Sequence, residues 1–76
     1  MPRLSCTFAQ FIAIIEANGF VLHRHEGGSH RRYRGEIDGQ VRLVTVAVHR
    51  MSDPIKLGTL EAMIRQSGLV KSLFRS

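Results

Sequence analysis

The chain has 76 residues, the length of one small domain, and a chain of this size buries only roughly 60% of its unfolded surface. Its hydrophobic fraction of 43% argues against disorder, and no stretch approaches the ~20 apolar residues of a membrane-spanning helix. The net charge of +5 points to nucleic acid or an acidic protein as partner, and a single cysteine, Cys6, fits a reducing cytoplasm.

The first predicted element is a helix over residues 7–18. Thr7 followed by Gln10 is the signature of a capping box at a helix start. The apolar residues then recur at helical spacing, as Phe8, Phe11, Ile12 and Ile15. Gly19 can adopt the left-handed conformation that ends a helix. We assign the apolar stripe of this helix to the core.

Three strands are expected next, over residues 20–24, 29–34 and 41–48. In the first strand we expect Phe20 and Leu22 to point inward and His23 and His25 to point outward, because side chains alternate along a strand. The glycine-bounded segment 35–39 has the length of a hairpin loop and joins the second strand to the third.

The register of the second and third strands follows from keeping arginines out of the core. With Arg34 opposite Val41, His30 lies opposite Thr45, and residues opposite one another share a face. One face then carries the core residues Tyr33, Val44, Val46 and Val48. The other, open face carries His30, Arg32, Arg34, Thr45 and His49, with His49 near Glu26 and ~13 Å from His30 along the strand.

A second helix is expected over residues 57–67, after an irregular segment at 50–56. Its apolar positions are Leu57, Leu60, Met63 and Ile64, and Gly68 ends it. Lys56 and Thr59 lie at its start, where free backbone N–H groups can bind phosphate. Residues 69–74 add one helical turn on the core. The order α-β-β-β-α predicts a two-layer α+β domain, with a three-stranded antiparallel sheet and two helices on one face.

The strongest candidate site is the Gly-Gly-Ser-His stretch at residues 27–30 and the arginines behind it. Glycines let the backbone approach a ligand, histidine exchanges protons near neutral pH, and arginine has a planar fork suited to phosphate. Residues 23–34 contain seven arginine or histidine side chains against one acid, Glu26. This pattern favours nucleic-acid contact, and a hairpin turn followed by a polar strand is the structural alternative.

The acidic residues argue against a metal site, because they are scattered over the predicted helix, turns and loop without the convergence that Mg²⁺ needs. His23 and His25 alternate on a strand and Cys6 is remote, so zinc is not expected either. Without a metal or cofactor, RNA can still be cleaved, because its 2′-OH can attack the neighbouring phosphate. A histidine moves the proton and an arginine stabilises the phosphate, and His30 with Arg32 meets this minimum.

Several short segments carry a resemblance to a known family. They are, in order, Asn18-Gly19-Phe20, Gly28-Ser29-His30 with Tyr33, Val46-Ala47-Val48-His49, and Leu57-Gly58-Thr59-Leu60 with Ile64 and Gly68. The chain resembles the HicA toxins, small ribonucleases paired with a HicB antitoxin, over about residues 7–69. The resemblance implies a fold like the double-stranded-RNA-binding domain, metal-independent mRNA cleavage and a growth-arresting toxin. His30 corresponds to the catalytic histidine of the family's Gly-Ser-His motif.

We therefore expect residues 1–76 to form a single HicA-like domain, a cytoplasmic endoribonuclease with His30 as its catalytic residue and a HicB-type antitoxin as partner. The expected RNA contacts are Gly28, Ser29, Arg32, Arg34, His49, Lys56 and Thr59. His49 is also compatible with a plain polar position at a strand end. The family usually has a basic residue before a single Gly-Ser-His, whereas Glu26-Gly27 adds one residue and an acid here. A non-catalytic RNA-binding module of the same fold and an inactive toxin that only holds its partner are the alternatives.

Overall fold

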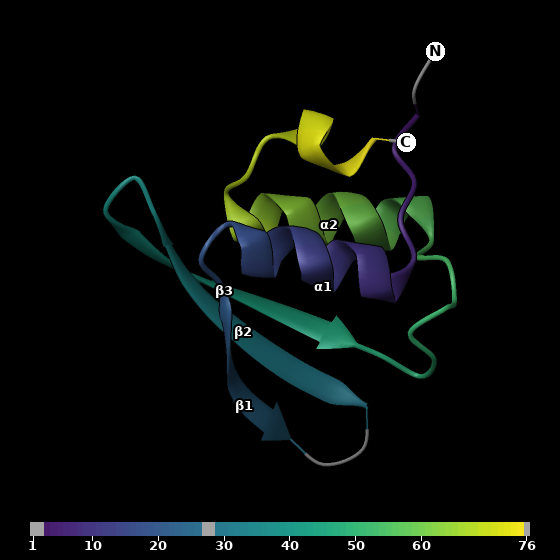
Figure 1. The fold of residues 1–76 in the computed structure, drawn as a ribbon, viewed down its shortest axis with the longest axis horizontal. Coiled ribbons are helices and arrows are strands. Elements are labelled where there is room, and N and C mark those ends of the chain that lie inside the picture. The colour runs from purple at the N-terminus through teal and green to yellow at the C-terminus, as the bar shows by residue number, and fades with distance from the viewer. Residues whose placement is uncertain (1–2, 27–28, 76) are drawn as a thin grey trace.

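The computed structural model describes residues 3–26 and 29–75. Its elements are, in chain order, α1 (Phe8–Ala17), β1 (Val21–Glu26), β2 (His30–Ile37), β3 (Gln40–Ala47), α2 (Leu57–Ser67) and a 3₁₀ helix, η1 (Lys71–Phe74). The strands form one antiparallel sheet in the order β1-β2-β3, and both α-helices lie on one of its faces (Figure 1). The predicted α+β arrangement is therefore confirmed. The predicted turn at Gly27 and Gly28 lies outside the described residues.

Helix α1 begins with the predicted capping box. The backbone N–H of Gln10 donates to Thr7 Oγ1 at 3.2 Å, and the backbone N–H of Thr7 donates to Gln10 Oε1 at 2.9 Å. The next free N–H groups donate to the loop before α2, from Phe8 to the carbonyl of Asp53 and from Ala9 to that of Met51. The start of α1 is thus held by both its own side chains and this loop.

The hairpin between β2 and β3 is tighter than the predicted loop over residues 35–39. Its turn consists of Asp38 and Gly39, with φ of 54° and 78°, and Asp-Gly is the pair that such two-residue turns favour. Gly35 instead lies within β2, where a Cβ would come 2.7 Å from the ring of Phe20. The loop prediction was therefore wrong, because Gly35 leaves room for an aromatic ring and does not form a turn.

The shorter turn also corrects the register between β2 and β3. Arg34 pairs with Leu43 and His30 with Ala47, where Val41 and Thr45 had been predicted. The error is two residues, because the turn is centred between Asp38 and Gly39, one residue further along the chain than the predicted pairing requires, and moving a turn by one residue shifts the register by two. A shift by two keeps every side chain on its predicted face.

Strand β1 departs from regular alternation. Leu22 pairs with Tyr33 and Arg24 pairs with Arg32, so His23 is an extra residue in a β-bulge. Leu22 shares the helix-facing side of the sheet with Tyr33, as predicted, but its side chain is 49% exposed and so is not part of the buried core. Strand β1 is an edge strand, and α2 packs on β3 at the opposite edge. The helix layer therefore leaves Leu22 half uncovered.

The core lies between the helices and one face of the sheet. As predicted, the sheet contributes the buried side chains of Tyr33, Val44, Val46 and Val48. The helices contribute, among others, Phe11, Ile15, Leu60 and Ile64. Phe74 of η1 is also buried, and its ring stacks on that of Phe11 at a centroid distance of 5.1 Å.

Helix α2 ends at Gly68, with φ of 72°, as the sequence predicted. Within the described chain, no helix is long and apolar enough to cross a membrane.

Candidate nucleic-acid interface

Three predicted site residues, His30, Arg32 and Arg34, alternate along β2. Their partners on β3 are Ala47, Thr45 and Leu43, in that order. The residues between them share a face with buried valines, so these three belong to the sheet face that the helices leave open. Successive members are about 7 Å apart along the strand. The open face therefore presents one histidine and two arginines in a row, as predicted.

A small cavity of about 230 Å³ lies at the start of this row. His30, Arg31, Arg32 and Thr45 line it. Arg31 had not been predicted as a site residue, because alternation along the strand places it with the helix-facing residues, and its partner in the structure is the buried Val46. The open-face side chains at this cavity thus offer an imidazole that can transfer protons, the guanidinium of Arg32 and the hydroxyl of Thr45.

Arg24 is a second residue that sequence reasoning missed. A regular β1 would place His23 opposite Arg32, but the bulge places Arg24 there. Bulges re-aim side chains in this way, often beside functional sites. Arg24, Arg32 and Thr45 consequently form one row across all three strands of the open face. The sequence does not reveal this shift, because no apolar residues alternate with polar ones directly after Leu22.

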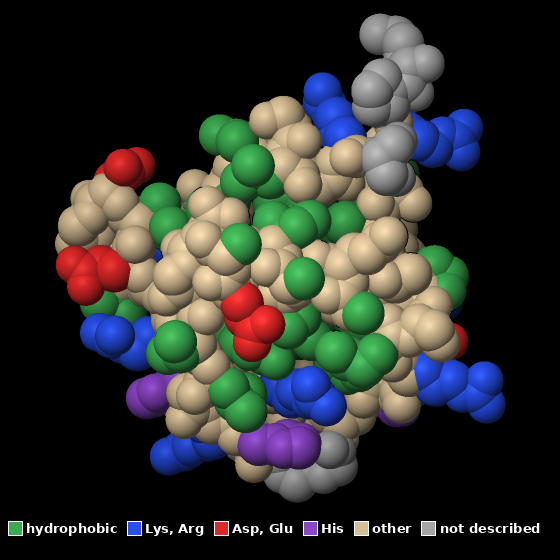
Figure 2. All heavy atoms as spheres, in the orientation of Figure 1, with side chains coloured by type: hydrophobic (Ala, Val, Ile, Leu, Met, Phe, Trp, Pro, Cys, Tyr) green, Lys and Arg blue, Asp and Glu red, His purple; other side chains and the backbone are tan. Residues whose placement is uncertain are grey.

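Arg24 and Arg32 are two residues of like charge directly opposite one another on neighbouring strands. Residues directly opposite have Cβ atoms ~5 Å apart, and like charges there destabilise the strand pair. An anion bound over two guanidinium groups forms charge-assisted hydrogen bonds with both of them. Figure 2 shows the visible histidines at the lower end of the molecule among arginine or lysine side chains, where Figure 1 places β1 and the start of β2.

The remaining predicted site residues are spread over the molecule. Ser29 adjoins His30, and its carbonyl accepts a hydrogen bond from the backbone N–H of Val48 at 2.8 Å. His49 is exposed and follows β3, which ends at Ala47, so its predicted place on the open face near Glu26 was wrong. The pairing of β2 with β3 ends at His30 and Ala47, two residues before His49.

Lys56 and Thr59 lie at the start of α2, in the helix layer. Lys56 is the N-cap, and its side chain does not cap the helix. Because α2 packs on the face of the sheet opposite to His30, the structure does not bring these two residues to the cavity. Gly28 lies outside the described residues.

The described part of the chain does not gather metal-ligating side chains. There, no three His, Cys, Asp or Glu side chains are grouped so that they could hold a metal ion. Cys6 is buried and donates to the carbonyl of Phe74, with an Sγ–O distance of 3.5 Å. Burial raises the pKa of the Cys6 thiol, which disfavours the thiolate that a metal or a nucleophilic mechanism would need.

Comparison with known proteins gives one match. The model of the HicA toxin of bacterial toxin–antitoxin systems matches residues 8–69, from the first residue of α1 to the residue after Gly68. No curated protein and no solved structure matches the chain. The matched range spans most of the chain, including the whole sheet and both α-helices. The chain therefore belongs to the HicA toxin family of bacterial toxin–antitoxin systems.

Proposed function

We propose that this toxin is a metal-independent endoribonuclease that cleaves mRNA in the cytoplasm, with His30 as its catalytic residue. The observation that carries the proposal is the cavity that His30 shares with Arg32 and Thr45 on the open face. The open position of His30 at the start of β2 gives a nucleic-acid strand access to its imidazole. Membership of a toxin family supports the growth-arresting outcome.

The reaction needs a base, an acid and a positive charge beside the phosphate. In the cavity, His30 serves as base and then as acid, and Arg32 supplies the charge. The 2′-OH loses its proton to the imidazole of His30, and the 2′-oxygen bonds to phosphorus. The bond between phosphorus and the 5′-oxygen then breaks, and the imidazolium returns a proton to the leaving oxygen. The guanidinium of Arg32 stabilises the charge on the crowded phosphate. The products are a 2′,3′-cyclic phosphate and a 5′-hydroxyl, and no metal takes part.

Substrate binding in this proposal uses the arginines of the open face. Arg32 and Arg34 continue the row that starts at His30, so one strand of RNA can lie along β2 and present successive phosphates to them. Arg24 adds a second guanidinium beside Arg32. Two neighbouring guanidinium groups can bind one phosphate together.

The other predicted contacts extend this path. Gly28 and Ser29 precede His30 and are proposed to approach the RNA backbone, and His49 is proposed to contact RNA beyond the end of β3. Lys56 and Thr59 are proposed to hold a phosphate at the start of α2, which no side chain caps. This helix start follows the segment by which the chain passes from β3 to the helix layer. Residues 1–76 would act as one domain, similar to the double-stranded-RNA-binding domain, and a HicB-type antitoxin would neutralise it.

A non-catalytic RNA-binding module is the second candidate. One observation favours it: His30 is the one side chain of the cavity lining suited to general acid–base catalysis, so it has to act first as base and then as acid. A pure binding protein needs no such group, and the arginine row alone serves it.

Incubation of a labelled RNA and the matched DNA with the purified toxin in EDTA tests the proposal. We expect cleavage of the RNA alone, ending in a cyclic phosphate. His30→Ala should lower the rate by ~10²–10⁴ while RNA affinity changes little. His23→Ala, which removes an exposed histidine from the neighbouring strand, is the matched control and should cut at the wild-type rate. Loss of cleavage in EDTA, or a folded His30→Ala variant of full activity, contradicts the mechanism, and intact RNA with the wild type supports the binding module.

A further inference from the structure

A second concave surface lies on the side of the molecule away from the open face. Here the N-terminal segment, α2 and η1 enclose a groove of about 630 Å³, a size typical of ligand sites. Figure 1 shows these elements together at the top of the view, with the sheet below the helices. The lining residues are Arg3, Leu4, Ser5, Leu57, Glu61, Lys71 and Arg75. His30 and the arginine row contribute nothing to it.

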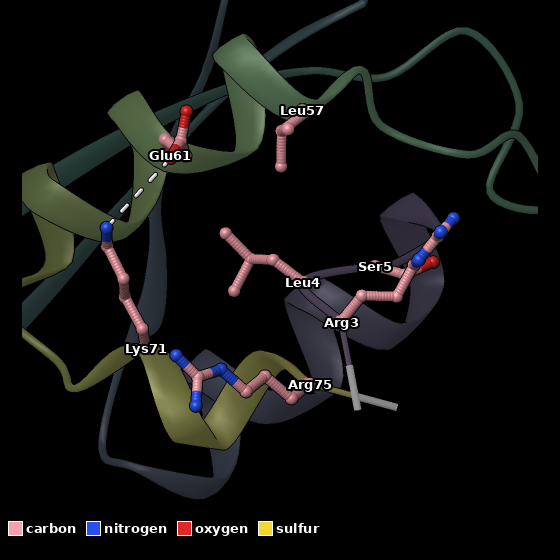
Figure 3. A pocket seen from close by; sticks show the side chains of 7 residues that line it. All are labelled: Arg3, Leu4, Ser5, Leu57, Glu61, Lys71 and Arg75. Carbon is pink, nitrogen blue, oxygen red and sulfur yellow. Dashed lines mark ion pairs between the residues drawn. The ribbon is translucent and has the colours of Figure 1, made fainter. Parts of the chain in front are cut away.

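The middle of this groove is apolar. Figure 3 shows the side chains of Leu4 and Leu57 facing one another across it, one from the N-terminal segment and one from the first turn of α2. Leu57 is 57% exposed although it is a large aliphatic residue in a helix. The two leucines thus leave apolar surface that a further aliphatic side chain could cover.

The rim of the groove is cationic. Arg3, Lys71 and Arg75 carry three positive charges, and Glu61 is the one acid in the lining. Lys71 Nζ lies 3.9 Å from Glu61 Oε2, and both side chains are substantially exposed, so water screens this ion pair and it contributes little. The groove therefore suits a ligand that is apolar at its centre and negatively charged at its edges.

This chemistry selects the class of occupant. Single-stranded RNA binds by stacking its bases on aromatic rings, and none of the seven lining residues is aromatic. A second copy of this chain would bring another net charge of +5 to a cationic rim. An acidic protein segment with an aliphatic side chain satisfies both the leucines and the cations.

We propose that this groove binds an acidic segment of the antitoxin, which inserts an aliphatic side chain between Leu4 and Leu57. Carboxylates of that segment pair with Arg3, Lys71 and Arg75. A toxin of a toxin–antitoxin system has a protein partner, its antitoxin. The inference does not depend on RNA cleavage, because the groove and the His30 cavity share no lining residue.

The test compares three toxin variants with the wild type in calorimetric titration against the antitoxin encoded beside the toxin. Leu57→Asp places an acid in the groove, and an acid in the first turn of a helix favours the helix, so the fold should persist. Lys71→Glu reverses one rim charge. Val70→Asp is the matched control, since Val70 is 63% exposed in the neighbouring segment and does not line the groove.

We expect Leu57→Asp and Lys71→Glu each to weaken antitoxin binding at least tenfold, with a shallower salt dependence for Lys71→Glu, while Val70→Asp binds as the wild type does. Leu57→Asp places an acid between Lys56 and Thr59, the proposed phosphate contacts at the start of α2, so RNA affinity is compared in Lys71→Glu and Val70→Asp, where it should be unchanged. Unchanged antitoxin affinity of folded Leu57→Asp and Lys71→Glu overturns the proposal. A loss of RNA affinity in Lys71→Glu that Val70→Asp does not show also overturns it, because it assigns the groove to nucleic acid.

Discussion

Gly35 offers the sharpest test of how the sheet is built. In the structure this glycine lies in the middle of β2, and the ring of Phe20 packs directly on it. A Cβ at residue 35 would lie 2.7 Å from Cγ and Cδ1 of Phe20 and 2.8 Å from Cδ2, which is too close for any real contact. Phe20 is fully buried and cannot move aside freely. Gly35→Ala is therefore an overpacking substitution, which typically destabilises by about 1–3 kcal/mol.

For a domain of this size the expected loss corresponds to a melting temperature lowered by about 5–20 °C. Urea denaturation followed by circular dichroism measures the loss in the free energy of unfolding, and a thermal melt measures the shift in melting temperature. Gly58→Ala is the control, because a Cβ there meets no atom within 4 Å, and alanine in a helix is up to about 1 kcal/mol better than glycine. Phe20→Leu should make the Gly35→Ala change less costly, as expected for residues in contact. This packing is refuted if the free energy of unfolding of Gly35→Ala lies within about 0.5 kcal/mol of the wild-type value. Phe20 would then not pack on this backbone, and residue 35 would behave as part of a loop.

Three further predictions concern the open face and the core. Arg24→Ala should reduce the slope of log affinity against log salt for single-stranded RNA by about 0.7, the value for one lost phosphate contact. The control His23→Ala should leave this slope unchanged. If both variants have the same slope, the bulge does not aim Arg24 at the RNA. Because burial raises the folded-state pKa of Cys6, its contribution to stability is fully present below the unfolded value of 9.0 and is lost as pH rises through the folded-state pKa. Cys6→Ala should flatten this alkaline loss in denaturation curves, and a loss of equal size in that variant would assign it to another group. Phe74→Ala removes the stack on Phe11 and should lower the free energy of unfolding by about 3–5 kcal/mol, far more than Leu73→Ala at the neighbouring exposed position.

The helices could be predicted from the sequence because their signals are local. The capping box of Thr7 and Gln10 lies within four residues, and Gly68 marks the end of α2 without reference to the rest of the chain. Gly35 shows where local signals fail. Its neighbourhood reads as a loop because Gly39 lies nearby, but its role depends on Phe20, which is distant in sequence. A contact of this kind leaves no periodic pattern that a sequence analysis could detect.

The open face of β2 was assigned correctly although the register was not. An error of two residues preserves which side chains share a face, and the buried valines of β3 exclude every shift by one. Strand β1 has no such constraint after Leu22, because His23, Arg24 and His25 are all polar and all exposed. At this edge of the sheet, these polar side chains stay out of the core whichever of them point to the open face. Packing therefore does not select the phase, and the position of Arg24 beside Arg32 depends on the bulge in the backbone.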